Sequence, residues 1–197
     1  MKILVACEFS GTVRDAFIAR GHDAWSCDIL PTEVPGPHIE GDVLPVLNQG
    51  WDLMIGHPPC TRLANSGVRW LYTGGRGGER DPKMWEAMLE GVAFFNALWA
   101  APIPKIAIEN PVMHRHGKAR LTAGEQSQIV QPYQYGDPYQ KATCLWLKGL
   151  PKLVPTNIVE GREQECWNQS PGPDRWRKRS KTYQGIANGM AAQWGVA

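Results

Sequence analysis

The residues best suited to chemistry follow an apolar segment of strand length. The segment, residues 51–56, ends at a glycine, and His57, Pro58, Pro59 and Cys60 come directly after it. Two prolines rule out both helix and sheet pairing, so a thiol is presented at the carboxyl end of the predicted strand. Ligands bind at this edge of an open α/β sheet, where a thiolate can act as a nucleophile. The alternative is a small buried side chain after a rigid turn, because free cysteine is among the residue types most often buried.

A second buried-strand pattern, residues 105–108, ends in Glu109, Asn110 and Pro111. Residues 84–99 lie between the two strands and carry apolar side chains at three- and four-residue spacing, which predicts a core-facing helix. A strand–helix–strand succession favours parallel strands, whose carboxyl ends meet at one edge of the sheet. We therefore expect Cys60 and Glu109 to be neighbours.

The first part of the chain predicts a strand–helix–strand unit. Residues 2–6 are an apolar run, Gly11 precedes a helical pattern over residues 13–17, and residues 23–27 form a second strand that ends in Asp28. In such units the first turn approaches a cofactor, and an acidic residue at the end of the second strand accepts hydrogen bonds from ribose hydroxyls. A single glycine lets the backbone come close to a nucleoside. Asp28 could equally be a solvated strand end or a helix cap.

The remaining elements complete an α/β fold class with a mostly parallel sheet and helices on both faces. Residues 30–50 are rich in proline and are predicted to be irregular. We expect a short helix over residues 124–130, a strand over residues 143–147 and a helix over residues 183–194. A chain of 197 residues has room for one core, so we expect a single domain over residues 1–197.

The segment after Cys60, residues 61–82, is rich in glycine and arginine. A segment of this composition and length predicts either a mobile lid, whose arginines could meet phosphates, or a disordered insertion. The arginines are Arg62, Arg69, Arg76 and Arg80.

A basic run lies near the end of the chain. Residues 175–181 contain five basic residues and Trp176. Such a run suits a phosphate backbone with a stacking partner, but it is also typical of a solvated loop.

Composition describes a soluble globular protein, with 43% hydrophobic and 20% charged residues. A net charge of +2 implies that any contact with nucleic acid comes from local clusters. No stretch approaches the roughly 18 apolar residues that span a bilayer, and the amino terminus has no signal-peptide layout. We expect a cytoplasmic protein with no membrane contact. The five cysteines are widely spread and never form a CxxC pair, which predicts reduced thiols.

With these motifs placed, the chain resembles a small DNA cytosine-5 methyltransferase. That family carries a Pro-Cys nucleophile and a Glu-Asn pair after two successive strands, as residues 59–60 and 109–110 do here. Further segments of the chain that resemble the family are Phe9-Ser10-Gly11, Asp28, Gly41-Asp42, Ala64-Asn65-Ser66-Gly67 and Gly185-Ile186-Ala187-Asn188. The resemblance therefore spans most of the chain and implies a Rossmann-like S-adenosylmethionine-dependent methyltransferase fold.

The resemblance also implies roles for individual residues. Cys60 would be the nucleophile and Glu109 would stabilise charge on the cytosine ring, a role that works best if the pKa of its carboxyl is raised. The methyl donor would be S-adenosylmethionine, bound by Phe9, Ser10, Gly11, Asp28, Ile29, Asp42, Pro58 and Asn188. Substrate contacts would come from Pro59, Arg62, Asn110, Lys141, Thr143, Arg177 and Arg179. The expected partner is nucleic acid, most simply DNA.

Three departures from the family pattern shape the alternatives. His57 replaces a common small residue, and the family's Gln-x-Arg-x-Arg strand is replaced by residues 140–144. Residues 150–181 form only a short insert where the family has its DNA-reading domain, so we expect short, relaxed or absent sequence specificity. The same chemistry on RNA or a free pyrimidine nucleotide, or a catalytically silent nucleic-acid-binding protein, are the alternatives. We expect no metal site, because the spacing of His57, Cys60, His114 and His116 matches no common zinc pattern.

Overall fold

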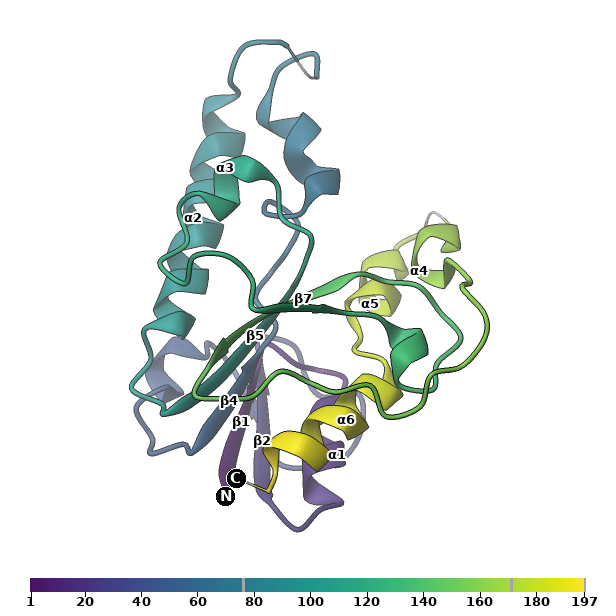
Figure 1. The fold of residues 1–197 in the computed structure, drawn as a ribbon. Coiled ribbons are helices and arrows are strands. Elements are labelled where there is room, and N and C mark those ends of the chain that lie inside the picture. The colour runs from purple at the N-terminus through teal and green to yellow at the C-terminus, as the bar shows by residue number, and fades with distance from the viewer. Residues whose placement is uncertain (76, 171, 197) are drawn as a thin grey trace.

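In the computed structural model, which describes residues 1–75, 77–170 and 172–196, seven strands form one sheet (Figure 1). The order across the sheet is β3-β2-β1-β4-β5-β7-β6. The parallel strands are β1 (Lys2–Ala6), β2 (Asp23–Asp28), β3 (His38–Glu40), β4 (Leu53–Gly56) and β5 (Lys105–Pro111). Strand β7 (Thr143–Lys148) runs antiparallel to β5, and β6 (Gln128–Val130) runs antiparallel to β7.

The central strands are buried on both faces, as the unbroken apolar runs predict. Alternate residues of β1 enter two separate cores: Leu4 packs in one and Ile3 in the other. Helix α2 (Pro82–Trp99) covers the first core, while α1 (Thr12–Ile18) and α6 (Gln184–Trp194) cover the second (Figure 1). The predicted α/β class with helices on both faces is confirmed.

Helix α2 shows why the local sequence folds as it does. The side chain of Asp81 caps its amino end by accepting a hydrogen bond from the Met84 N–H at 3.1 Å, and Pro82 occupies the first turn, where it displaces no hydrogen bond. Its buried stripe, which packs on the sheet, consists of Trp85, Met88, Val92, Phe95 and Leu98. The amino end of α2 and the segment before it project beyond the sheet (Figure 1).

Two predictions about local structure were wrong. Residues 124–130 contain strand β6 and no helix, because the sheet edge offers pairing partners: the Ser127 N–H donates to the Leu145 carbonyl at 2.8 Å. The proline-rich residues 30–50 contain β3 and a short 3-10 helix, η1 (Leu44–Val46). Pairing with β2 orders this part of the chain.

The remaining elements are short. The segment after Cys60 contains a 3-10 helix, η2 (Asn65–Leu71), and the chain beyond β5 contains α3 (Arg115–Lys118) and η3 (Pro132–Gln134). The predicted insert, residues 150–181, contains α4 (Glu165–Asn168) and α5 (Arg175–Ser180). None of the helices in the described ranges has the length and hydropathy that crossing a bilayer requires.

Candidate active site

The carboxyl ends of β4 and β5 bring His57 and Glu109 together. Gly56 pairs with Ile108 across the two parallel strands, so the residues that follow each of them are neighbours. The Nδ1 of His57 lies 3.0 Å from Oε2 of Glu109, and both side chains are about nine-tenths buried. Because an ionised carboxylate only accepts hydrogen bonds, the hydrogen of this bond lies on Nδ1 when Glu109 is charged.

The electrostatics of Glu109 differ from the expectation for a free acid. Burial raises the pKa of its carboxyl, but the hydrogen bond from His57 and the charge of Lys141 outweigh burial, so the pKa lies below its ordinary value. The sequence led us to favour a raised pKa. The difference arises mainly from His57, which replaces a residue that is commonly small in the family that the chain resembles.

Cys60 follows the two prolines and is partly exposed. Its carbonyl accepts hydrogen bonds from the N–H groups of Leu63 and Ala64, which fixes the backbone just beyond the thiol. Burial and the charge of Glu109 raise the pKa of the thiol, while Lys141 and Arg179 oppose the rise. Charged groups from β5, from the segment before β7 and from α5 therefore all act on one sulfur atom.

Several predicted substrate contacts surround this thiol. Asn110 is buried, donates from Nδ2 to the Pro58 carbonyl at 3.1 Å, and has no partner for Oδ1 among the described residues. The Lys141 ammonium donates to the backbone carbonyls of Arg179 and Lys181 at 3.0 and 3.3 Å. Lys141 therefore ties the end of α5 to this side of the sheet.

Other predicted substrate residues lie in varied surroundings. Thr143 is buried and donates to the Lys141 carbonyl, and Pro59 is exposed beside Cys60. Arg62 is partly exposed, and its carbonyl accepts a hydrogen bond from His114 Nε2 at 2.7 Å. Arg177 forms an ion pair with Glu33.

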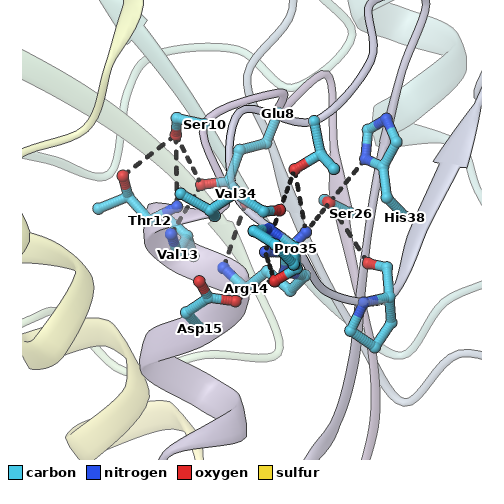
Figure 2. Close-up of polar contacts among 12 residues, drawn as sticks. Glu8, Ser10, Thr12, Val13, Arg14, Asp15, Ser26, Val34, Pro35 and His38 are labelled. Atoms are coloured by element: carbon cyan, nitrogen blue, oxygen red, sulfur yellow. Dashed lines mark hydrogen bonds and ion pairs between the residues drawn. The ribbon is translucent and has the colours of Figure 1, made fainter.

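The first turn is built around Glu8, which the sequence reasoning missed as a structural residue. Its carboxylate accepts hydrogen bonds from the N–H groups of Val13 and Arg14 at 2.6 and 3.2 Å and from the Ser10 hydroxyl at 3.2 Å (Figure 2). Glu8 thereby caps the amino end of α1 from a position outside the helix. The sequence did hold a signal for this cap, since the acidic Glu8 comes shortly before Gly11 and the helical pattern that follows it.

Arg14 is fully buried beside this turn and holds the segment after β2 in place. Its guanidinium bonds to Asp15, Ser26, Thr32 and the carbonyls of Val34 and Pro35 (Figure 2). Gly11 adopts φ +75°, and a Cβ there would lie 2.6 Å from both Arg14 Nη2 and Val34 Cγ2. The single glycine of this turn is thus required by both conformation and space.

The predicted cofactor residues lie on both sides of this turn. Phe9 is buried against Trp176 and lies beneath the guanidinium of Arg177, so a ligand stacking on Phe9 would have to displace α5. Asp28 ends β2 and accepts a hydrogen bond from the Leu30 N–H at 3.0 Å, and Ile29 beside it is 76% exposed. An acceptor carboxylate next to an exposed apolar side chain fits a nucleoside with its ribose and base.

The other cofactor predictions are less closely grouped. Pro58 is buried at the edge of the sheet between His57 and Cys60. Asp42 is exposed and accepts from the Leu44 N–H at 3.0 Å, so it caps η1. Asn188 is exposed on α6 and bonds to Gln184 of the same helix.

The start of the predicted lid is anchored to the chain after β5. Ala64 pairs with Met113, and the His114 N–H donates to the Leu63 carbonyl at 2.9 Å. Further along, Tyr72 pairs with Arg80, whose guanidinium lies 4.3 Å from the centre of a Trp85 ring. Arg76, one of the arginines predicted to meet phosphates, lies outside the described residues.

Comparison with known proteins yields neither a matching family model nor a matching curated protein. Solved structures do match. An E. coli prophage-encoded protein assigned as a DNA modification methyltransferase aligns with a TM-score of 0.52 at 14% identity, over 86% of this chain and 55% of that chain. A methyltransferase of Entamoeba histolytica aligns with a TM-score of 0.46 at 13% identity, over 83% of this chain and 57% of that chain. The chain thus spans little more than half the length of these structures.

The alignment with the prophage protein covers most of this chain. At this level of identity the likeness concerns the fold. The chain has a Rossmann-like α/β fold, similar to that of the prophage protein.

Proposed function

We propose that this protein transfers a methyl group to C5 of cytosine in DNA through a covalent bond between Cys60 and C6. The observation that carries the proposal is the convergence of Cys60 and Glu109 at the ends of adjacent parallel strands, where the carboxylate acts on the thiol. The fold shared with a protein assigned as a DNA modification methyltransferase supports the same reading.

The chemistry explains why both groups are needed. C5 of cytosine is too poor a nucleophile to accept a methyl group unaided. Addition of the Cys60 thiolate forms a bond from Sγ to C6 and moves the C5–C6 π electrons to C5, which can then attack an electrophile. As C5 takes the methyl group, the bond between that methyl group and the sulfur of the donor would break, and its electron pair would stay on that sulfur. Loss of the C5 proton to solvent and departure of the thiolate would then restore the C5–C6 double bond.

Glu109 would hold the base during this addition. Ionised, as its lowered pKa favours in the free protein, it accepts a hydrogen bond from the exocyclic amine of cytosine. Negative charge develops on the ring as Cys60 adds, and exclusion of water by the base raises the pKa of the carboxyl toward sharing a proton with N3. His57 keeps the carboxylate oriented throughout.

The methyl donor would be S-adenosylmethionine, which supplies an electrophilic methyl group. Asp28 would accept hydrogen bonds from the ribose hydroxyls, and Ile29 would lie against the adenine. The turn from Phe9 to Gly11 would approach the remainder of the molecule, with its backbone fixed by Glu8.

A nucleic acid would be held by local positive charge. Lys141 and Arg179 lie near enough to Cys60 to affect its ionisation, so an anionic phosphate beside the target base would meet cations. A base in duplex DNA must be turned out of the helix to reach the thiol, and the segment 61–82 would close over it. Because the insert at residues 150–181 is small, few side chains would reach base edges, so we expect low sequence specificity.

The small insert also favours the second candidate, the same chemistry on RNA or on a free pyrimidine nucleotide. These substrates need no reading of duplex sequence. They would use Cys60 and Glu109 in the same roles.

The deciding experiment is covalent trapping with 5-fluorocytosine. In 5-fluorocytosine a fluorine replaces the C5 hydrogen. It cannot be removed as the proton is, so the thiolate cannot depart and a competent enzyme stays covalently attached to its substrate. Duplex DNA, single-stranded DNA, RNA and the free nucleotide are each incubated with S-adenosylmethionine, with Cys60→Ala as control. We expect a stable adduct on Cys60 with DNA. An adduct with RNA or the nucleotide alone would select the second candidate, and absence of any adduct would favour a silent nucleic-acid-binding protein.

A further inference from the structure

His57 has one nitrogen that the proposed chemistry does not use. Its side chain is 9% exposed and its Nδ1 is engaged with Glu109, but its Nε2 is buried and has no hydrogen-bond partner among the residues that the structure describes. Buried polar atoms are nearly always paired, so an orphaned one at a candidate site calls for an explanation. A bound group that donates a hydrogen bond would provide one.

His114 shows what a purely structural buried histidine looks like in the same chain. Its Nε2 lies 2.7 Å from the Arg62 carbonyl, and its Nδ1 accepts from the Gly117 N–H at 3.1 Å. Both nitrogens are thus satisfied within the protein. His57 differs in having only one satisfied nitrogen, and it lies at the carboxyl edge of the sheet, where ligands bind in this class of fold.

The strand that precedes His57 lies between the two parts of the proposed site. Strand β4 lies between β5, which carries Glu109, and β1, which is followed by β2 and Asp28. Nδ1 bonds to Glu109 at the end of β5, and the two nitrogens of an imidazole point in divergent directions, so Nε2 points away from Glu109.

Asn110 carries a second buried acceptor at this edge for which no hydrogen-bond donor is found among the described residues. Its Nδ2 is held by the Pro58 carbonyl, which turns its Oδ1 into a second buried acceptor without a partner among the described residues. An imidazole that carries its one hydrogen on Nδ1 presents Nε2 as an acceptor as well. Two unsatisfied acceptors therefore flank the proline pair before Cys60.

We propose that His57 contacts the methyl donor directly, with Nε2 accepting a hydrogen bond from its hydroxyl or ammonium groups while Nδ1–H orients Glu109. This inference rests on the proposed function for the identity of the donor. One side chain then joins the two halves of the site: the cofactor on the β1–β2 side and the target base on the β5 side. Because Nε2 is closed off from water in the free protein, the atoms that cover it must shift when the donor binds.

Two substitutions separate the two nitrogens. In His57→Asn the side-chain amide N–H lies close to the place of Nδ1 and can still donate to Glu109, but nothing replaces Nε2. In His57→Gln the amide lies close to the place of Nε2. We expect His57→Asn to bind S-adenosylmethionine about 3- to 10-fold more weakly than the wild type in titration calorimetry, and His57→Gln to bind more tightly than His57→Asn. Equal affinity of both variants and the wild type would contradict the proposal.

A measurement on the wild-type protein avoids any dependence on the folding of the variants. With 15N-labelled histidine, the Nε2 resonance of His57, assigned by its loss in His57→Gln, should move when S-adenosylmethionine binds. Both nitrogens of His114 serve as the internal control and should not move. Calorimetric binding with an unmoved Nε2 would overturn this inference alone, whereas absence of S-adenosylmethionine binding by the wild type would overturn the proposed cofactor together with it.

Discussion

The rings of Phe9 and Trp176 lie with their centroids 5.9 Å apart, although one belongs to the first turn and the other to α5 near the end of the chain. Ion pairs from Arg177 and Lys181 to Glu33 accompany this contact. The basic run predicted to contact phosphates is therefore partly engaged within the protein. Helix α5 is fastened to the region where the cofactor is expected.

The first prediction concerns this fastening. Glu33→Gln removes two ion pairs, each worth roughly 0.2–1 kcal/mol where the partners are partly exposed. Trypsin cleavage within residues 175–181 should accelerate by about 2- to 30-fold, since cleavage follows the population of the opened segment. Mass spectrometry of the fragments gives the rate at each bond. Glu160→Gln, an exposed carboxylate in the same insert, is the matched control. Equal rates for both variants would mean that other contacts hold α5.

The second prediction concerns the thiol. Burial and then the charge of Glu109 raise the pKa of Cys60, so at neutral pH the thiolate fraction is below that of an ordinary cysteine. Alkylation by iodoacetamide, followed by peptide mapping, should therefore speed up as pH rises through the alkaline range. Glu109→Gln removes one cause of the rise, and its profile should shift to lower pH.

The control for this shift is Glu90→Gln, which changes an exposed carboxylate on α2. It should leave the pH profile of Cys60 alkylation in place. A Glu109→Gln profile that coincides with the wild type would separate Glu109 from Cys60 electrostatically and would weaken the proposed mechanism.

The third prediction concerns stability. Arg14→Met removes the guanidinium donor from several buried or partly buried oxygen atoms around the first turn, among them the hydroxyls of Ser26 and Thr32. We expect the free energy of unfolding to fall by about 3 kcal/mol or more, as measured by urea denaturation. Arg20→Met changes an exposed arginine at the end of the same helical segment and should cost about 0.5 kcal/mol or less. A similar small loss for both would show that water replaces the Arg14 contacts at little cost.

The fourth prediction concerns the cofactor. Asp28→Ala should weaken S-adenosylmethionine binding by about 1–3 kcal/mol, or about 5- to 150-fold, because a partly buried acceptor is lost. Asp23→Ala, at the opposite end of the same strand, provides the control and should leave the affinity in titration calorimetry near that of the wild type. Unchanged binding in Asp28→Ala would place the cofactor elsewhere.

Much of the fold could be predicted because the buried strands are unbroken apolar runs. Strands β1, β4 and β5 and helix α2 follow directly from the pattern of apolar residues and from prolines and glycines at their ends. Strand β6 could not be predicted, since it consists of three residues that depend on β7 for their hydrogen bonds. Its sequence has no periodicity of its own.

The candidate site shows the same division. The proximity of Cys60 and Glu109 follows from the rule that parallel strands end at one edge. The roles of Arg14 and His57 could not be read from spacing, because each depends on which atoms the side chain meets after folding. For this reason the sequence predicted a raised pKa for Glu109, whereas the structure lowers it. The imidazole that lowers it follows a different strand.

The pairing of Ala64 with Met113, together with the anchoring of Leu63 by His114, gives the segment after Cys60 a fixed base. A movement of the residues beyond Ala64 would therefore leave the backbone around Cys60, and with it the sulfur atom, in place. In the proposed mechanism, the direction of the Cys60 thiol and the opening of the site would thus be set separately. Insertions or deletions around the Tyr72–Arg80 pair should alter how quickly substrates come and go, while the angle at which Sγ meets a bound base stays the same.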